Sequence, residues 1–200
     1  MNSTARNRTR DLAYIAVFAA LIVVMGVIAI PVGAAGVPLV LQNAVIILAG
    51  LVLGPRRGFL AVLLVLALGL VGLPVLSGGS STLAALAGPT AGYVLAYPFS
   101  ALIAGFVAYQ APRRPAWLRA VVFAAAAICG LLVQYAGGAV GLTVMADLGA
   151  VEAALAQVPF FFPALIEQTA MVAIALGVHA AFPNLQGRRK KSVTQQKIAV

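Results

Sequence analysis

A few polar side chains set within long apolar stretches are the candidates for chemistry in this sequence. Glu167 and Gln168 lie in one stretch, Gln42 opens another, and Gln134 lies inside a third. Glu167 comes seven residues after Phe160, which places it about 10 Å along a helix. A carboxylate buried in a membrane is costly unless it is protonated, paired or hydrated, so Glu167 is a functional candidate. The alternative is a structural Glu that hydrogen-bonds to a neighbouring helix.

The sequence matches no known catalytic or metal-binding pattern. It contains no P-loop pattern and no HExxH pattern, and Cys129 and His179 each stand alone. We therefore expect no metal, no cofactor and no ATPase activity, and we interpret His179 as an interfacial residue. An enzyme that pairs Glu167 with Asp147 or His179 is a weak alternative, because His179 lies about 18 Å along the helix from Glu167.

The composition indicates whether these residues belong to a soluble domain or to a membrane protein. Hydrophobic residues make up 63% of the 200 residues, and charged residues make up 8%. A soluble domain is roughly half apolar and a quarter charged. Because this chain lacks the polar residues to cover a water-exposed surface, its surface must face lipid. We predict an all-α integral membrane protein.

Six apolar stretches are candidates for membrane spans, each close to the length that a bilayer requires. Gly and Pro residues end most of them. A signal peptide in the first stretch is an alternative, but that apolar run is longer than the usual signal core. We expect a basic N-terminus at 1–10, a single membrane domain at 11–183, and a basic, disordered tail at 184–200. The stretches are 12–30, 39–53, 59–73, 89–109, 117–145 and 159–182.

The basic residues are separated to one side of the predicted spans. All thirteen lie at the N-terminus, in the second and fourth gaps, and in the C-terminal tail. The positive-inside rule therefore predicts cytoplasmic N- and C-termini, and the separation itself supports an even number of spans. The net charge of +9 is explained by these anchors rather than by nucleic-acid binding. They are Arg6, Arg8, Arg10, Arg56, Arg57, Arg113, Arg114, Arg119, Arg188, Arg189, Lys190, Lys191 and Lys197.

The loops on the opposite side are rich in Gly, Pro and Ser. Irregular backbone near a membrane is tolerated where it is buried in protein or lines a wet cavity. A ligand site under these loops and an ordinary extracellular loop are both consistent with the composition. The first loop contributes Gly33, Gly36 and Pro38, and the third contributes Pro74, Ser77, Gly78, Gly79, Ser80, Ser81 and Thr82. In the long fifth stretch, Gly137, Gly138 and Gly141 suggest a kink or an unwound turn.

Several ordered motifs resemble the BioY family, the biotin-specific S components of energy-coupling factor (ECF) importers. The resemblance covers about residues 10 to 110 and rests on four segments. They are Val-Pro-Leu-Val-Leu-Gln-Asn at 37–43, Leu-Gly-Pro-Arg-Arg-Gly at 53–58, Gly-Leu-Pro-Val-Leu-Ser-Gly-Gly at 72–79 and Gly-Pro-Thr-Ala-Gly-Tyr at 88–93.

The resemblance implies a six-helix S-component fold in a bacterial cell membrane. It implies capture of biotin from outside and delivery together with a transmembrane T component and two ATPase subunits. In this class an Ala-x-x-x-Ala pattern on the first helix contacts the T component, and Ala16 and Ala20 fit it. Pro89 is expected to begin the fourth helix, whose N-terminus suits a carboxylate.

The expected substrate-binding residues combine the polar span residues with the outward loop. They are Gln42, Ser77, Gly78, Gly79, Ser80, Thr90, Tyr93, Glu167 and Gln168.

The last span departs from the family pattern. The family has Pro-Gly-Asp followed three residues later by Lys, and alignment on Pro163 places Leu165 at the Asp and Gln168 at the Lys. Val94 stands where some members have Arg. The outer half of the chain therefore holds no cation for the biotin carboxylate. An alternative function is the same architecture with a different small ligand, such as a biotin precursor or another vitamin.

Overall fold

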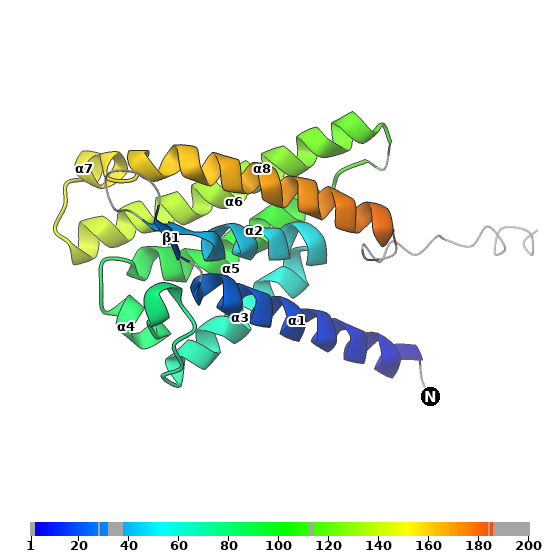
Figure 1. The fold of residues 1–200 in the computed structure, drawn as a ribbon, viewed down its shortest axis with the longest axis horizontal. Coiled ribbons are helices and arrows are strands. Elements are labelled where there is room, and N and C mark those ends of the chain that lie inside the picture. The colour runs from blue at the N-terminus through cyan, green and yellow to red at the C-terminus, as the bar shows by residue number, and fades with distance from the viewer. Residues whose placement is uncertain (1–2, 28, 32–37, 113, 184, 186–200) are drawn as a thin grey trace, which may run out of the picture.

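A computed structural model describes residues 3–27, 29–31, 38–112, 114–183 and 185. The predicted tail at 184–200 falls outside these residues, apart from Leu185, as do Gly33 and Gly36 of the first loop. Long helices run roughly along one direction of the molecule (Figure 1). In chain order the elements are α1 (Ser3–Val27), β1 (Ala29–Pro31), β2 (Pro38–Val40), α2 (Leu41–Leu53), α3 (Pro55–Leu70), the 3-10 turn η1 (Ser77–Gly79), α4 (Thr82–Leu86), α5 (Ala91–Ala108), α6 (Ala116–Met145), α7 (Ala150–Leu155) and α8 (Val158–Ala181).

Helix α2 forms the centre of the core. It contacts α1, α3, α5, α6 and α8, and it lies among these helices in Figure 1. Eleven of its residues are buried, including Ile46, Ile47 and Leu51. The helix is apolar on every side, as expected for a helix that is surrounded by protein. The predicted all-α membrane architecture is therefore confirmed.

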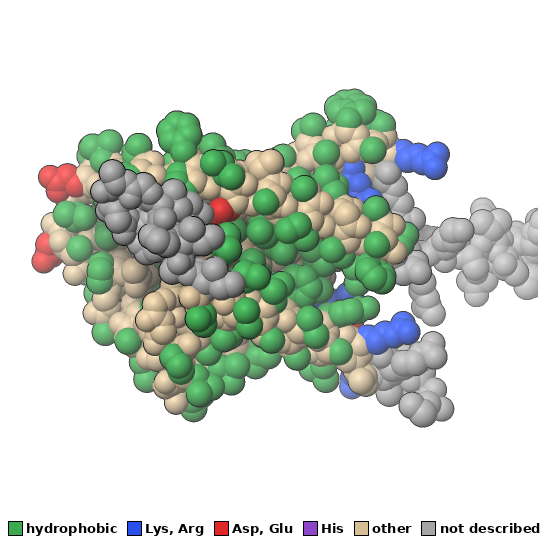
Figure 2. Space-filling view, viewed as in Figure 1, with side chains coloured by type: hydrophobic (Ala, Val, Ile, Leu, Met, Phe, Trp, Pro, Cys, Tyr) green, Lys and Arg blue, Asp and Glu red, His purple; other side chains and the backbone are tan. Residues whose placement is uncertain are grey.

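In the described part of the chain, four segments are long and apolar enough to cross a membrane: Arg8–Val27, Ala91–Ala108, Ala116–Met145 and Ala150–Ala181. Helices α2 and α3 have 13 and 16 residues, which is shorter than the usual span of about 20. Hydrophobic side chains cover much of the visible face (Figure 2). The six predicted stretches correspond to α1, α2, α3, α5, α6 and α8, and the count of six crossings stays a prediction.

The charged side chains are separated along the molecule. On the face seen in Figure 2, basic side chains gather at one end, and acidic side chains lie at the other end and at one place between. At the basic end, Arg57 lies 2.7 Å from the carboxylate of Asp11 and donates a hydrogen bond to the carbonyl oxygen of Leu185 at 3.4 Å. These contacts join α1 and α3 to the chain that follows α8.

The first predicted span ends earlier than expected. Helix α1 stops at Val27 rather than at residue 30, because the following residues pair with the chain before α2. Strands β1 and β2 are antiparallel, with Ala29 opposite Val40 and Pro31 opposite Pro38. This short hairpin is also an exception to the all-helical prediction.

The third and fourth spans are shifted as well. Helix α3 begins at Pro55, in the first helical position, after Gly54 turns the chain with a φ of 83°. Helix α5 begins at Ala91, with Thr90 as the N-cap residue, so the expectation that Pro89 starts this helix is wrong. The backbone N–H of Ala91 donates to the carbonyl of Gly88 at 3.1 Å, which holds Pro89 in a turn before the helix.

Helix α6 is continuous from Ala116 to Met145, so the prediction of an unwound turn at its glycines is wrong. The glycines instead allow α5 and α6 to pack closely against each other. A Cβ atom on Gly92 of α5 would lie 2.6 Å from the backbone N of Gly141. A Cβ atom on Gly137 would lie 2.5 Å from the Cβ of Ala96. Small residues therefore let α5 and α6 approach closely, as in many membrane helix pairs.

His179 is buried rather than interfacial. Its side chain is 2% exposed, and its Nε2 donates to the carbonyl oxygen of Leu51 at 2.9 Å. The hydroxyl of Tyr109 donates to the carbonyl oxygen of Val52 at 2.9 Å. Both side chains satisfy carbonyls in the last turn of α2, which have no partner within that helix. The predicted interfacial role was wrong because α2 ends inside the protein.

Candidate functional site

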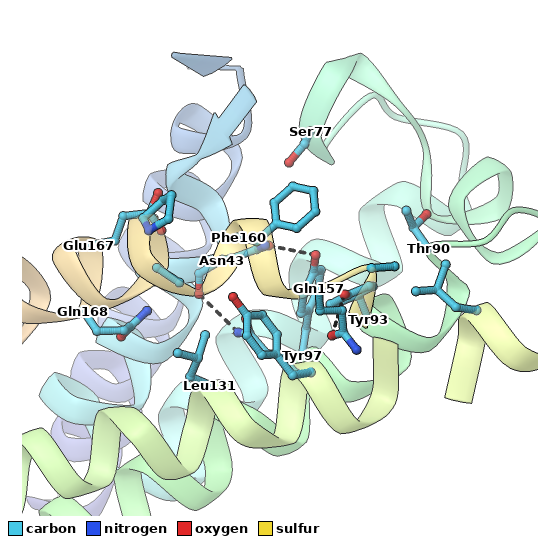
Figure 3. A pocket seen from close by; sticks show the side chains of 16 residues that line it. Asn43, Ser77, Thr90, Tyr93, Tyr97, Leu131, Gln157, Phe160, Glu167 and Gln168 are labelled. Atoms are coloured by element: carbon cyan, nitrogen blue, oxygen red, sulfur yellow. Dashed lines mark hydrogen bonds between the residues drawn. The ribbon is translucent and has the colours of Figure 1, made fainter. Parts of the chain in front are cut away.

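A cavity of about 450 Å³ lies among α2, α5, α6, α8 and the loop at η1. Its size falls within the range of about 300–1,000 Å³ that is typical of small-molecule sites. Figure 3 shows polar side chains from these different elements around it. The lining residues are Asn43, Ser77, Thr90, Tyr93, Tyr97, Leu131, Gln134, Tyr135, Leu142, Ala156, Gln157, Phe160, Pro163, Ala164, Glu167 and Gln168.

Three helices are joined by hydrogen bonds at one wall of the cavity. The hydroxyl of Tyr97 on α5 donates to Oδ1 of Asn43 on α2 at 2.8 Å. The side-chain amide of Gln134 on α6 donates to the backbone carbonyl of Asn43 at 3.2 Å and to Oγ of Ser100 at 3.0 Å. Gln134 is 1% exposed, and its partners satisfy its buried amide. These bonds fix the wall before any ligand arrives.

A second hydrogen bond joins α5 to the turn before α8. The hydroxyl of Tyr93 donates to Oε1 of Gln157 at 2.7 Å, and Nε2 of Gln157 donates to the carbonyl of Ala153 at 3.2 Å. A Cβ atom on Gly138 of α6 would overlap the Tyr93 ring, so this glycine makes the room in which the ring lies. Tyr93 and Gln157 therefore hold the two sides of the cavity together near the ends of these helices.

Gln42 holds the loop that covers the cavity. Its Nε2 donates to the carbonyls of Ile22 on α1, at 3.1 Å, and Val75, at 2.8 Å. Its Oε1 accepts from the backbone N–H and from Oγ of Ser77, both at 3.0 Å. Gln42 is 1% exposed and lies behind the wall, whereas Ser77 lines the cavity. Gln42 thus supports the site from behind.

Three polar atoms of the lining residues are buried and have no hydrogen-bond partner among the residues that the structure describes. They are the hydroxyl of Tyr135, Oε1 of Glu167 and Oε1 of Gln168. Buried polar atoms are rarely left without a partner, and each such atom requires an explanation. Each has almost no accessible surface, so none of the three opens onto the cavity in this arrangement of the side chains.

The structure brings five of the nine predicted site residues to the cavity: Ser77, Thr90, Tyr93, Glu167 and Gln168. Gln42 lies behind the wall, as described above. The other three, Gly78, Gly79 and Ser80, are in the loop and are not among the lining residues. The two glycines turn the chain with φ values of 72° and 73°, and the Ser80 hydroxyl donates to the carbonyl of Ser77 at 3.1 Å.

Several lining residues were not predicted from the sequence. Tyr97 follows Tyr93 by four residues, a spacing that places both on one face of α5. That spacing could have predicted that Tyr97 lines the site together with Tyr93. No comparable pattern marks Tyr135 or Gln157, because their positions at the cavity depend on how α6 and α8 pack.

The lining residues, all of which the structure describes, include no Lys, Arg or His, and Glu167 is the one ionisable carboxyl group among them. Within the described part of the chain, no group of three or more His, Cys, Asp or Glu residues is arranged to hold a metal ion. The arrangement therefore suits an organic molecule that offers hydrogen-bond donors to a carboxyl group.

Ala16 and Ala20 lie on a different surface. Both are exposed on α1, whereas Ile15, Ala19 and Ile22 of the same helix are buried against the core. The four-residue spacing places the two alanines on one outward face. They are available for contact with lipid or with another membrane helix.

Comparison with known proteins gives consistent results. The model of the BioY family matches residues 1–184. The biotin transporter BioY of Rhizobium etli is 38% identical over 184 residues, which cover 90% of this chain and 98% of that protein. The biotin transporter BioY of Rhodobacter capsulatus is 43% identical over 141 residues, 70% of this chain and 73% of that protein.

A solved structure shares the fold. The crystal structure of the S-component for biotin from an ECF-type ABC transporter superposes with a TM-score of 0.77 at 28% sequence identity. The match covers 90% of this chain and 95% of that chain. The similarity therefore extends over the described helices and is not confined to one motif.

Proposed function

The chain belongs to the BioY family, and from this membership we propose that it is the substrate-binding S component of an ECF-type importer that captures biotin in the cavity among α5, α6 and α8. It is a transport subunit and not an enzyme. It is a multi-pass protein of the bacterial cell membrane. The structural similarity to an S-component for biotin supports this function together with the two biotin transporters at 38% and 43% identity.

The observation that carries the assignment of the site is the cavity itself. Its lining combines aromatic and aliphatic side chains with a few polar groups, which is the usual character of a small-molecule site. Biotin has a fused bicyclic ring, a polar ureido group and an aliphatic tail. Tyr93, Tyr97 and Leu131 offer surface for the ring, and Ser77, Thr90, Gln157, Glu167 and Gln168 offer polar contacts.

The partners are a membrane-embedded T component and two ATPase subunits. The sequence holds no P-loop, so ATP is hydrolysed on other chains. The exposed pair Ala16 and Ala20 on α1 is the proposed contact with the T component, because small residues four apart let two membrane helices approach closely.

The orientation follows from the charges. The basic end of the molecule faces the cytoplasm, with both termini on that side, and the end that bears Asp147 and Glu152 faces outward. Ligand then reaches the cavity from the end that carries η1, α4 and α7. Energy coupling takes place at the other end and along α1.

Mass spectrometry of the small molecules that copurify with the protein tests this function. We expect biotin in the fraction released by denaturation of the wild-type protein, and a strongly reduced amount from a Thr90→Trp variant. Release of a different vitamin or of a biotin precursor would support the alternative ligand and contradict the assignment to biotin. Washed control membranes without the protein give the background.

A further inference from the structure

Asn43 opens onto the cavity from the central helix α2. Of the thirteen residues of this helix, eleven are buried, whereas Asn43 is partly exposed. Because α2 is surrounded by other helices and Asn43 lines the cavity, the exposed part of this side chain faces the cavity. Figure 3 shows Asn43 among the lining residues. The side chain is therefore accessible to a ligand.

The hydroxyl of Tyr97 fixes the orientation of the Asn43 amide. This hydroxyl donates to Oδ1 of Asn43 at 2.8 Å, and Tyr97 is 8% exposed. If the amide were turned the other way, Nδ2 would meet the Tyr97 oxygen, and the buried hydroxyl would lose its acceptor. The bond therefore holds Oδ1 toward Tyr97 and leaves Nδ2 on the other side. Gln134 holds the main chain at the same place through the carbonyl of Asn43.

The Nδ2 atom of Asn43 is a donor without a partner in the described part of the chain. Both hydrogen bonds of Asn43 at the cavity wall use its oxygen atoms, one in the side chain and one in the backbone. Nδ2 is not one of the buried polar atoms that lack a partner, so it retains accessible surface. A fixed N–H donor of Asn43 is consequently available in the cavity.

Other donors in the lining are few. Four hydroxyls already donate to acceptors of the protein, and a hydroxyl has one hydrogen, so these groups can accept from a ligand but cannot donate to it. Both N–H groups of the Gln134 side chain are also in use, and the Tyr135 hydroxyl has almost no accessible surface. The lining residues, all described, include no Lys, Arg or His. The four hydroxyls are those of Ser77, Thr90, Tyr93 and Tyr97.

We propose that Asn43 recognises the ligand by donating a hydrogen bond from Nδ2 to one of its acceptor oxygens, and that Tyr97 is a positioning residue that holds the amide in this orientation. The proposal rests on the biotin-binding function given above. Biotin carries acceptor oxygens in its ureido carbonyl and in its carboxylate. A neutral amide can donate to either, so the chemistry is the same and the choice of oxygen is a matter for experiment.

A double variant separates binding from folding. Asn43→Leu removes the donor but leaves the buried Tyr97 hydroxyl without its acceptor, so it lowers stability as well as affinity. Asn43→Leu/Tyr97→Phe replaces both partners by apolar groups of similar shape, which is close to neutral for stability. We expect the double variant to unfold near the wild-type temperature without ligand, and to bind biotin at least about tenfold more weakly in titration calorimetry. Wild-type affinity in the folded double variant would overturn the proposal.

The Tyr97→Phe variant alone tests the positioning role. It keeps the donor but lets the amide turn, so we expect a loss of biotin affinity of about threefold. In the Asn43→Leu background the same substitution should cause no further loss, because Tyr97 acts through Asn43. A similar loss in both backgrounds, or none in the wild-type background, would contradict this role. Tyr109→Phe is the matched control and should keep wild-type affinity, since its hydroxyl donates to Val52 and does not line the cavity.

A second ligand identifies the oxygen. In the cyclic guanidine analogue of biotin, a nitrogen replaces the ureido oxygen. If the double variant binds this analogue as tightly as the wild type does, Asn43 donates to the ureido carbonyl. If the loss is as large as for biotin, Asn43 donates to the carboxylate, and either result supports the donor role. Absence of biotin binding to the wild-type protein would instead contradict the proposed function, whereas wild-type binding with no loss in the double variant contradicts this inference alone.

Discussion

Gln42 accepts two hydrogen bonds from Ser77, one from the backbone N–H and one from Oγ, each at 3.0 Å. The same side chain donates to Ile22 on α1 and to Val75 in the loop, at 3.1 and 2.8 Å. One buried amide thus connects the helix that carries the proposed partner contact to the loop that covers the cavity. Gly26 of α1 leaves room for it, since a Cβ there would lie 2.6 Å from its Nε2.

Replacement of Gln42 by Leu should destabilise the protein and weaken biotin binding together. The Leu side chain leaves the carbonyl of Val75 and the N–H of Ser77 without the partners that Gln42 supplies, and each buried unsatisfied group costs about 1–3 kcal/mol. The carbonyl of Ile22 loses one of its two bonds but keeps the bond within α1. We expect a lower unfolding temperature in detergent and a weaker calorimetric affinity for biotin. Gln110→Leu is the control, because Gln110 is exposed at the end of α5. Equal behaviour of the two variants would show that the Gln42 bonds do not hold the loop.

Thr90→Trp should block the mouth of the cavity without disturbing the core. Thr90 is exposed and lines the cavity, so a large side chain there can occupy the path of the ligand without strain. We expect biotin affinity to fall at least about tenfold while the unfolding temperature in the absence of ligand changes little. Leu83→Trp, at an exposed position of α4 outside the lining, should bind biotin as the wild type does. Full affinity in the Thr90 variant would exclude the proposed route.

Gly92→Ala should separate α5 from α6. The added Cβ would lie 2.6 Å from the backbone N of Gly141, and overpacking of this kind typically costs about 1–3 kcal/mol. For Gly177→Ala we expect no loss of stability, because nothing lies within 4 Å of its added Cβ. Alanine inside a helix is favoured over glycine by roughly 0.5–1 kcal/mol, so this variant should be slightly more stable. Thermal unfolding of both variants in the same detergent would test the pair, and a stable Gly92 variant would contradict the close approach.

Ala16→Trp and Ala20→Trp should disrupt assembly without affecting ligand binding. Both side chains point outward from α1, away from the cavity, so their enlargement leaves the site unchanged. We expect normal biotin affinity of the isolated protein and loss of copurification with the T component. Ala125→Trp, at an exposed position on α6, is the matched control and should retain the partner. Loss of the partner from all three variants, or from none, would argue against an interface at this pair.

The sequence predicted the helices better than the cavity. Charge separation and apolar length located six helical stretches, and the resemblance at 72–79 and 88–93 led to Ser77, Thr90 and Tyr93. The lining role of Tyr135 and Gln157 was not predictable in the same way. The helices that carry most of the lining are apolar on nearly every side, so no amphipathic stripe indicates which face turns inward.

Which face of each helix turns toward the cavity depends on packing between helices that are distant in the sequence. The close approach at Gly92, Gly137 and Gly141 sets the rotation of α6 against α5, and with it the position of Tyr135. The same glycines also suggested an unwound turn, because a single sequence does not show whether a glycine interrupts a helix or lets a neighbour approach. His179 was misplaced for a related reason, since its partner Leu51 is 128 residues away in the sequence.

Calorimetric titration of the purified, ligand-free protein with biotin tests the central claim most directly. The account predicts saturable binding with one biotin per chain, lost or strongly weakened in Thr90→Trp and retained in Leu83→Trp. Absence of saturable binding to wild-type protein at micromolar biotin, under conditions in which the protein remains folded, would contradict it.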